Sequence, residues 1–144
     1  MPLPLESENV SVQNGRWGED MACNFLRAKG YQIIERNVFP CPNDQRLEID
    51  IIAYEIAKDE IVFVEVKQHR THSPYESRLR SINRRKLKNL RLACNAYRRA
   101  NHIEKGYRFD VVEIYGEPSS DRPEIDHLED VRLFVTQPKF VKWS

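Results

Sequence analysis

Two apolar runs that carry charges, within residues 47–68, constrain this chain more than any other feature. The first run covers residues 47–52 and is rich in isoleucine, and the second covers residues 61–67 and contains isoleucine, valine and phenylalanine. β-branched and aromatic residues are typical of strands, and the segment between the runs is short enough for a hairpin turn. The pattern therefore predicts two paired strands.

The charged residues of these strands are spaced two apart. Glu48 and Asp50 lie in the first strand, and Glu65 and Lys67 lie in the second. Because strand side chains alternate between faces, each pair shares one face, opposite the neighbouring isoleucines or valines. If the strands pair, Asp50, Glu65 and Lys67 meet at the edge of a mostly apolar sheet, which makes them a candidate active site.

These charges have two interpretations. A glutamate and a lysine two apart on a strand commonly form an ion pair on a solvated face. Here, however, the charges interrupt almost continuous apolar runs, which are typical of a sheet covered on both faces. A lone charge there has no water to solvate it, so a functional site is favoured.

The chemistry that needs this set is metal-assisted hydrolysis of a phosphodiester. Asp50 and Glu65 would hold Mg²⁺ or Mn²⁺ through oxygen, with the Val66 backbone carbonyl as a third ligand and Glu48 ranked below them. Lys67 would orient or deprotonate the attacking water, or stabilise the charge that develops on the phosphate.

A second segment separates charge along the chain. Residues 77–103 contain nine basic residues and no acid, whereas the remaining 14 basic and 22 acidic residues give a net charge of −8. The overall charge of +1 therefore says little about partners, and the local segregation says more.

A helix is predicted over residues 82–101 of this segment, with an apolar stripe at helical spacing. A soluble outer face usually mixes charge signs, so an all-basic helix favours contact with phosphate over plain solvation. The expected nucleic-acid-binding residues are Arg84, Arg85, Lys86, Lys88, Arg91 and Arg98.

The remaining periodicity predicts one α/β domain. A helix is expected from Asn14 or Gly15 to Lys29, followed by strands at 31–37, 107–115 and within 125–134. With the central hairpin and the basic helix, this order predicts a mixed central sheet flanked by helices. Residues 1–13 are expected to form a flexible arm, 14–136 the domain and 137–144 a tail.

Glu19, Asp110 and two histidines are further polar residues with alternative roles. Glu19 is either an acid in the first turn of its helix, favoured by the helix dipole, or part of the site. Asp110 is expected to be structural. His69 and His72 do not have the spacing of a zinc site, so an exposed loop over residues 68–74 is favoured.

Composition excludes several classes of protein. At 144 residues the chain is the size of one domain, and no apolar run approaches the ~20 residues that span a bilayer. The N-terminus does not resemble a secretory signal. Three cysteines without a C-x-x-C spacing indicate neither a disulfide framework nor a zinc site, so a cytoplasmic location is expected.

Asp50 followed by Glu65-Val66-Lys67 resembles the D…(D/E)-x-K signature of the restriction-endonuclease-like nucleases. More narrowly, residues 15–131 resemble the YraN-like family of predicted endonucleases, which are related to archaeal Holliday-junction resolvases. The shared segments are 18–22, 30–31, 36–37, 48–52, 63–67 and 108–112, together with Lys86. The chain departs from the family before Glu48, where relatives carry a short connection and a glycine in place of Leu47.

The resemblance implies a restriction-endonuclease-like fold and a function. The expected protein is a Mg²⁺- or Mn²⁺-dependent endonuclease that cleaves DNA, including branched or structured DNA, and contacts its backbone without sequence specificity. In such proteins a glutamate matching Glu19 reaches the site as an extra ligand or water-orienting group. Relatives that act on symmetric junctions are dimers, so a homodimer is plausible.

Two alternatives stay open. The chain could keep the nuclease fold as a non-cleaving, nucleic-acid-binding accessory protein in repair or recombination. It could also be an interaction protein whose basic helix meets an acidic partner. Intact Asp50, Glu65 and Lys67 argue for cleavage, because a non-catalytic fold has little reason to keep charges in its core strands.

Overall fold

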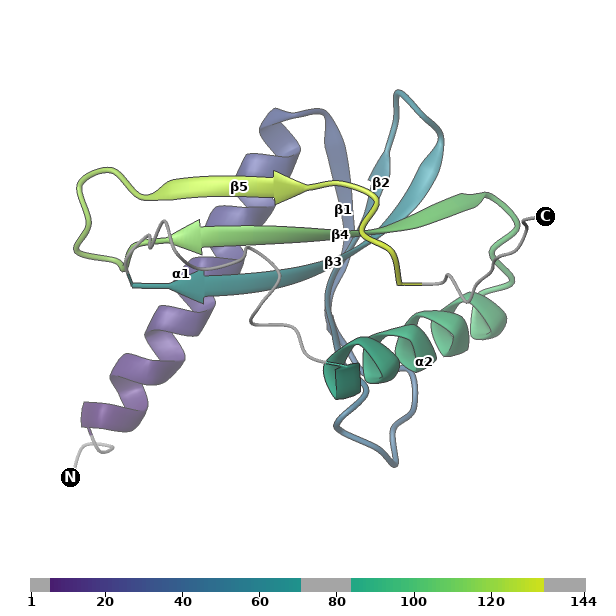
Figure 1. Ribbon diagram of the computed structural model, residues 1–144, viewed down its shortest axis with the longest axis horizontal. Helices are drawn as coiled ribbons and strands as arrows, with labels where there is room; N and C mark the ends of the chain where they lie inside the picture. The colour runs from purple at the N-terminus through teal and green to yellow at the C-terminus, as the bar shows by residue number, and fades with distance from the viewer. Residues whose placement is uncertain (1–5, 71–83, 134–144) are drawn as a thin grey trace.

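The structure is a computed structural model that describes residues 6–70 and 84–133, with side chains described from residue 15 onward. Two helices and five strands make up these residues (Figure 1). In chain order they are α1 (Glu6–Ala28), β1 (Tyr31–Val38), β2 (Ile49–Glu55), β3 (Glu60–His69), α2 (Arg84–Ala100), β4 (Gly106–Tyr115) and β5 (Glu124–Leu128).

The five strands form one mixed sheet in the order β1-β2-β3-β4-β5. Strands β1, β2 and β3 pair antiparallel, β3 and β4 pair parallel, and β5 returns antiparallel to β4. A parallel pair needs a crossover connection, and the segment that contains α2 provides it. The predicted hairpin and the predicted α/β class are both confirmed, and the arrangement is consistent with a restriction-endonuclease-like fold.

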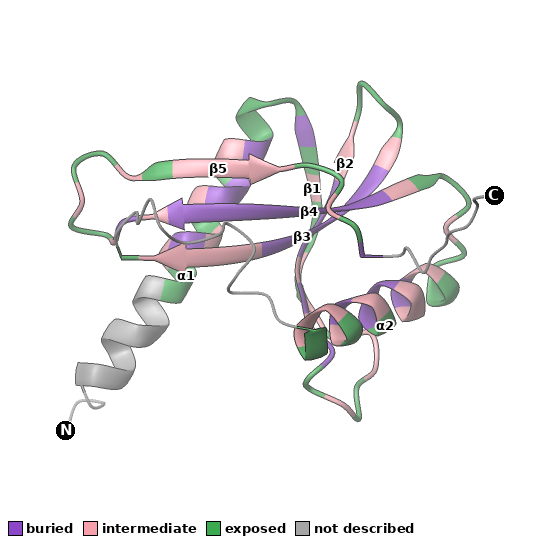
Figure 2. Ribbon diagram, viewed as in Figure 1, coloured by how far each residue is buried: buried purple, intermediate pink, exposed green. Residues whose placement is uncertain are grey.

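The helices cover opposite faces of the sheet, so the core has two halves (Figures 1 and 2). On one face Ala22, Cys23 and Leu26 of α1 pack on the sheet. On the other face α2 contributes the buried residues Leu90, Ala93, Cys94 and Tyr97, close to the predicted stripe. Since apolar side chains cover both faces, a charged residue on an inner strand is removed from water.

Alternation along β3 assigns its charged residues to the α2 face. Val62 and Val64 pack with α1, whereas Ile61 and Phe63 pack with α2. Glu65, Lys67 and His69 continue the second set, since they are two, four and six residues beyond Phe63. The charged residues at the end of β3 therefore lie on the face of the sheet that α2 covers.

The first helix begins earlier than the sequence pattern predicts. It starts at Glu6 rather than near Asn14, so much of the segment expected to be a flexible arm is helical. Pro2 and Pro4 precede this start and no proline follows before Pro40, so the backbone chemistry does not stop a helix within residues 6–14. The partition into arm, domain and tail stays a prediction, because residues 1–5 and 134–144 lie outside the described residues.

The end of the helix agrees with its glycine signal. Gly30 has a φ of 94°, a left-handed conformation that glycine adopts without steric cost, and its N–H donates to the Arg27 carbonyl. Gly18 has a different role: a Cβ there would lie 2.7 Å from the Gln68 side-chain oxygen. The glycine therefore lets α1 lie close to the end of β3.

The expected loop after Lys67 is wrong at its start. Gln68 and His69 continue β3 and pair with Ile114 and Tyr115, while His72 lies outside the described residues. The last strand is shorter than the predicted range 125–134 and ends at Leu128. Among the described residues, no helix combines the length and apolar character needed to cross a membrane. All three cysteines are free thiols.

Candidate functional site

The candidate site lies where β2 and β3 separate. Their pairing ends at Ile51 and Val64, so the next positions, Asp50 and Glu65, stand at the fork. The Val66 N–H donates to the Asp50 Oδ2 atom at 2.9 Å. A side chain thus accepts a backbone hydrogen bond beyond the last paired residues, and this bond fixes the Asp50 carboxylate beside β3.

Glu65 is the most deeply buried acid of this fork, with 3% of its surface exposed. Burial and the nearby charge of Asp50 raise the pKa of Glu65 to about 8. Burial also raises the pKa of Asp50, against the opposing effect of the Val66 N–H. Two carboxylates held this close in a low dielectric do not both ionise readily without a compensating cation.

Two lysines from different elements reach the same carboxylate oxygen. The Lys67 Nζ atom lies 3.7 Å from Glu65 Oε2, and the Lys86 Nζ atom of α2 lies 3.4 Å from it. The structure therefore brings together Asp50, Glu65 and Lys67, as the strand pattern predicts, and adds Lys86. Helix α2, in the crossover connection, carries this second ammonium group in its first turn.

Glu48 and Glu19 lie at the margin of this cluster. Burial, followed by the charges of Asp50 and Glu19, raises the pKa of Glu48, so these three acids are within electrostatic range of one another. The Glu19 carboxylate accepts hydrogen bonds from Asn37 at 3.0 Å and from Arg36 at 3.4 Å. Since α1 begins at Glu6, Glu19 lies far from the first turn, and the explanation by the helix dipole is wrong.

The fork fits a hard divalent cation better than a preformed metal cage. In the part of the chain that the structure describes, no three acidic, histidine or cysteine side chains are grouped as ligands. Mg²⁺ commonly keeps several waters and takes one or two carboxylates, which is what Asp50 and Glu65 offer. Among the described residues, the buried Glu65 Oε1 atom also has no hydrogen-bond partner, so it could serve as a ligand.

Basic residues surround a hollow beside the first turns of α2. Arg84, Arg85 and Lys88 line it together with Arg46 from the loop before β2, and its volume is about 420 Å³. Asp44 holds the Arg46 guanidinium through two hydrogen bonds, at 2.9 and 2.8 Å. Sequence reasoning missed Arg46, because nothing in the sequence places the 39–48 loop beside α2.

The other two expected phosphate contacts on α2, Arg91 and Arg98, differ in how free their side chains are to reach a ligand. Arg91 is partly exposed, farther along the helix. Arg98 stacks on the Tyr107 ring, 3.7 Å from its centroid, and donates to Asn95. That arginine is therefore engaged in packing against β4, and it is the weakest of the predicted phosphate contacts.

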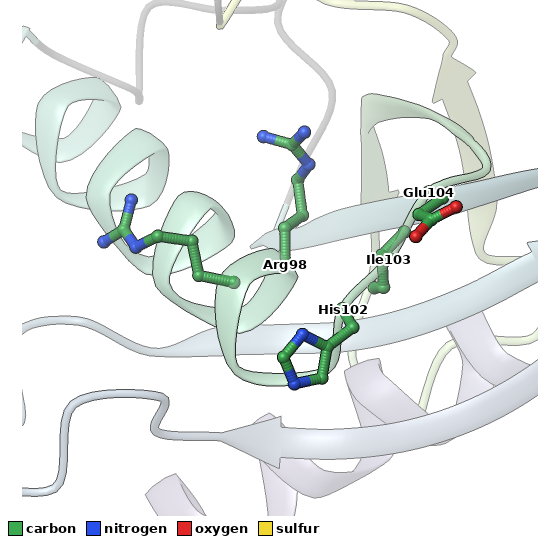
Figure 3. Close-up of a pocket in the computed structure, with 5 residues that line it drawn as sticks. Arg98, His102, Ile103 and Glu104 are labelled. Carbon is green, nitrogen blue, oxygen red and sulfur yellow. The ribbon is translucent and has the colours of Figure 1, made fainter.

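A second hollow, of about 330 Å³, lies at the C-terminal end of α2 and is lined by Arg98, Arg99, His102, Ile103 and Glu104. The Arg98 guanidinium extends away from the His102 ring, and Glu104 lies on the far side of Ile103 (Figure 3). Its polar groups do not converge on a common point, so this hollow does not have the arrangement of a binding site.

Asp110 belongs to a separate buried network on the α1 face. Its carboxylate accepts from Arg108 at 2.9 and 3.1 Å, from the Asp130 N–H at 2.9 Å, and pairs with His127 at 2.7 Å. Burial alone would raise the pKa of Asp110, but the hydrogen bonds from His127 and Arg108 lower it below its ordinary range. The structural role expected for Asp110 is consistent with these contacts.

Glu113 is a buried acid that the sequence pattern did not indicate. It lies on β4 opposite Lys67 of β3, with no exposed surface, and its Oε1 atom lies 3.7 Å from the His69 ring. Its position beside Lys67 depends on the parallel register of β3 and β4. The sequence predicts both strands but contains no signal for that register.

Comparison with known proteins gives one consistent match. Residues 18–114 match the model of a family described as "Uncharacterised protein family UPF0102". A UPF0102 protein of Clostridium perfringens is 40% identical over 88% of this chain and 97% of its own length. UPF0102 proteins of Flavobacterium psychrophilum (35% identical, 81% and 90% covered) and Acetivibrio thermocellus (38% identical, 92% and 98% covered) are similar over comparable spans.

Proposed function

This chain belongs to the UPF0102 family, and we propose that it is a metal-dependent endonuclease that hydrolyses phosphodiester bonds in DNA. One observation carries the proposal: the buried carboxylate of Glu65 and the partly buried carboxylate of Asp50 share a fork between paired strands, and two lysines reach into that fork. A structural ion pair needs one acid and one base. Here both lysines approach the Oε2 atom of Glu65, while its buried Oε1 atom has no hydrogen-bond partner among the described residues and leaves a place for a further cation.

Asp50 and Glu65 would hold Mg²⁺ or Mn²⁺, with the Val66 backbone carbonyl as a third ligand and Glu48 as a more distant one. When bound, the ion would polarise the phosphate and lower the pKa of a coordinated water. Glu19 would assist from α1, where Asn37 and Arg36 donate hydrogen bonds to its carboxylate within electrostatic range of Glu48.

Lys67 would act on the water or on the phosphate. Its ammonium group lies beside Glu65, within reach of anything bound at the fork, and it is partly exposed. There it can orient the attacking water or donate hydrogen bonds to the phosphoryl oxygens as negative charge develops on them. Lys86, on the other side of the same carboxylate oxygen, would add a second positive charge.

The DNA backbone would run from the fork across the basic hollow on α2. Arg84, Arg85 and Lys88 surround this hollow with Arg46, and Lys86 connects the same helix to Glu65. Contacts of this kind neutralise phosphates and carry no sequence information. Any selectivity would therefore come from the shape of the substrate, which fits branched or structured DNA.

The test is a cleavage assay with labelled duplex, single-stranded and branched DNA in Mn²⁺. Asp50→Ala and Lys67→Ala are expected to reduce the rate at least about 100-fold, within the range for removing a group that stabilises a transition state. Asp121→Ala, on an exposed loop, is the matched control and is expected to cleave like the wild type.

Activity that survives both site substitutions would come from a contaminating nuclease and would contradict the proposal. Salt-sensitive DNA binding without cleavage of any substrate would instead support the accessory-protein alternative.

A further inference from the structure

Glu113 is a fully buried carboxylate that the proposed mechanism leaves unused and that, unlike Asp110, forms no ion pair with an arginine among the described residues. Its exposed fraction is 0%, and its Oε2 atom has no hydrogen-bond partner within the described residues. Burying a carboxylate costs on the order of several kcal/mol, and an apolar side chain of similar size would avoid this cost. A purely structural position near the end of a core strand would not favour this residue type.

Register places Glu113 directly beside the candidate site. It pairs with Lys67 across the parallel β3–β4 ladder. Phe109 and Val111 of β4 pack on the α2 side of the core, and Glu113 continues their alternation. Glu113 therefore faces the same side of the sheet as Glu65 and Lys67.

His69 and Tyr115 complete a rigid unit around this acid. The Tyr115 hydroxyl donates to Glu113 Oε1 at 2.5 Å, and the His69 Nε2 atom lies 3.7 Å from the same oxygen. The two rings stack, with centroids 4.9 Å apart and planes 19° from parallel. The His69 backbone carbonyl also accepts from the Gly116 N–H at 2.7 Å, so the imidazole is fixed at the end of β3.

Buried polar atoms without hydrogen-bond partners gather along this face. Among the described residues they include Glu65 Oε1, His69 Nε2 and Glu113 Oε2, which lie on two neighbouring strands. Buried polar groups normally find partners, so each such atom needs an explanation. The Glu65 atom is explained by the proposed cation, whereas His69 Nε2 and the Glu113 carboxylate face each other and are explained if they hold the imidazole ring in place.

We propose that His69, positioned by Glu113 and Tyr115, is a further contact for the DNA backbone. This inference rests on the proposed function and deepens it. His69 lies two residues beyond Lys67 on the same face, about 7 Å along the strand, so it would reach the phosphate next to the one at the fork. The Nε2 atom of His69 faces Glu113, so Nδ1 on the other side of the ring would donate to a phosphate oxygen.

The experiment measures both binding and cleavage. Binding of a fluorescein-labelled branched DNA is followed by anisotropy in Ca²⁺, and cleavage kinetics are followed in Mn²⁺. His69→Ala is expected to weaken binding and raise KM about tenfold, the factor for about 1.4 kcal/mol, with little change in kcat. His69→Gln keeps a donor and is expected to recover most of the affinity.

Glu113→Gln tests the positioning role. Its effect and that of His69→Ala are expected to be non-additive, because Glu113 would act through the histidine. His102→Ala, at an exposed histidine after α2, is the matched control and should bind like the wild type. If Glu113→Gln does not fold, Tyr115→Phe removes the hydroxyl donor to Glu113 and takes its place in the cycle.

Affinity and KM unchanged within twofold in His69→Ala would overturn the inference. So would equal losses in His69→Ala and His69→Gln, because only the loss of a donor should matter. Failure of the proposed function would look different. If the wild type does not cleave, that function fails, whereas the binding comparison in Ca²⁺ still decides the role of His69.

Discussion

At the scale of single residues, the protein buries charge in two contrasting ways. Around Arg108, the acids Asp110, Glu55 and Glu60 surround one guanidinium, so opposite charges lie together. At the fork, Asp50 and Glu65 place like charges together, and the lysines approach only from the edge. The first arrangement is a hydrogen-bonded network around one guanidinium, whereas the second, in the proposed function, would be completed by a bound cation.

The raised pKa of Glu65 predicts a specific dependence of stability on pH. A carboxyl group whose pKa is raised in the fold stabilises the protein below its ordinary pKa, and that contribution is lost as pH rises toward about 8. Glu65→Gln removes this dependence. In metal-free buffer the variant should gain at least about 1 kcal/mol in unfolding free energy at pH 8, relative to its difference from wild type at pH 5.

Urea denaturation of both proteins at the two pH values measures this difference. Glu124→Gln, at an exposed acid of β5, is the control and should show no such trend. A Glu65→Gln effect that is the same at pH 5 and pH 8 would show that the carboxyl group titrates normally.

At the scale of elements, hydrophobic periodicity predicted most of what is observed. The charged strands β2 and β3, the strand β4 and the stripe on α2 follow from local patterns, since alternation and helical spacing depend on near neighbours. The early start of α1 was missed because residues 6–13 carry no apolar periodicity. The packing of α2 on the sheet is the element-scale feature that the site depends on, because α2 carries Lys86.

Leu90 anchors α2, so its truncation should destabilise the protein. Its side chain is 2% exposed against the sheet, whereas Leu92 on the same helix is 43% exposed. Leu90→Ala should lower the unfolding free energy by about 2 to 5 kcal/mol, and Leu92→Ala by less than about 0.5 kcal/mol. Chemical denaturation measures both, and equal losses would mean that α2 docks through another face.

Tertiary pairing limited what the sequence could predict about the site. Asp50, Glu65 and Lys67 were predictable because a short hairpin brings their strands together. Glu113 and Arg46 were not, since one depends on a parallel register across a helical crossover and the other on the path of a loop. Such contacts join residues far apart in the chain, and local patterns do not encode them.

At the scale of the whole molecule, charge segregation is the dominant feature. The basic residues of α2 gather in one segment of a chain whose net charge is only +1. A locally concentrated positive potential attracts polyanions even when the total charge is near zero. The affinity for DNA should therefore depend on which basic side chains are removed, and not on the net charge of the protein alone.

A charge-matched comparison tests this directly. The triple variant Arg84→Ala, Arg85→Ala, Lys88→Ala should reduce the slope of log affinity against log salt by about 2 to 3, because each phosphate contact contributes about 0.9. The control triple, Arg27→Ala, Lys58→Ala, Arg122→Ala, removes the same charge from exposed positions away from α2. Equal slopes for the two triples would contradict a binding surface on α2.

The central claim is that Asp50 and Glu65 form a cation site, and a crystal soaked in Mn²⁺ tests it most directly. The account predicts an anomalous peak within about 2.5 Å of a carboxylate oxygen from each residue, and no such peak in an Asp50→Ala crystal. Saturating Mn²⁺ with no peak at the fork, or carboxylates that remain paired only with Lys67 and Lys86, would contradict it.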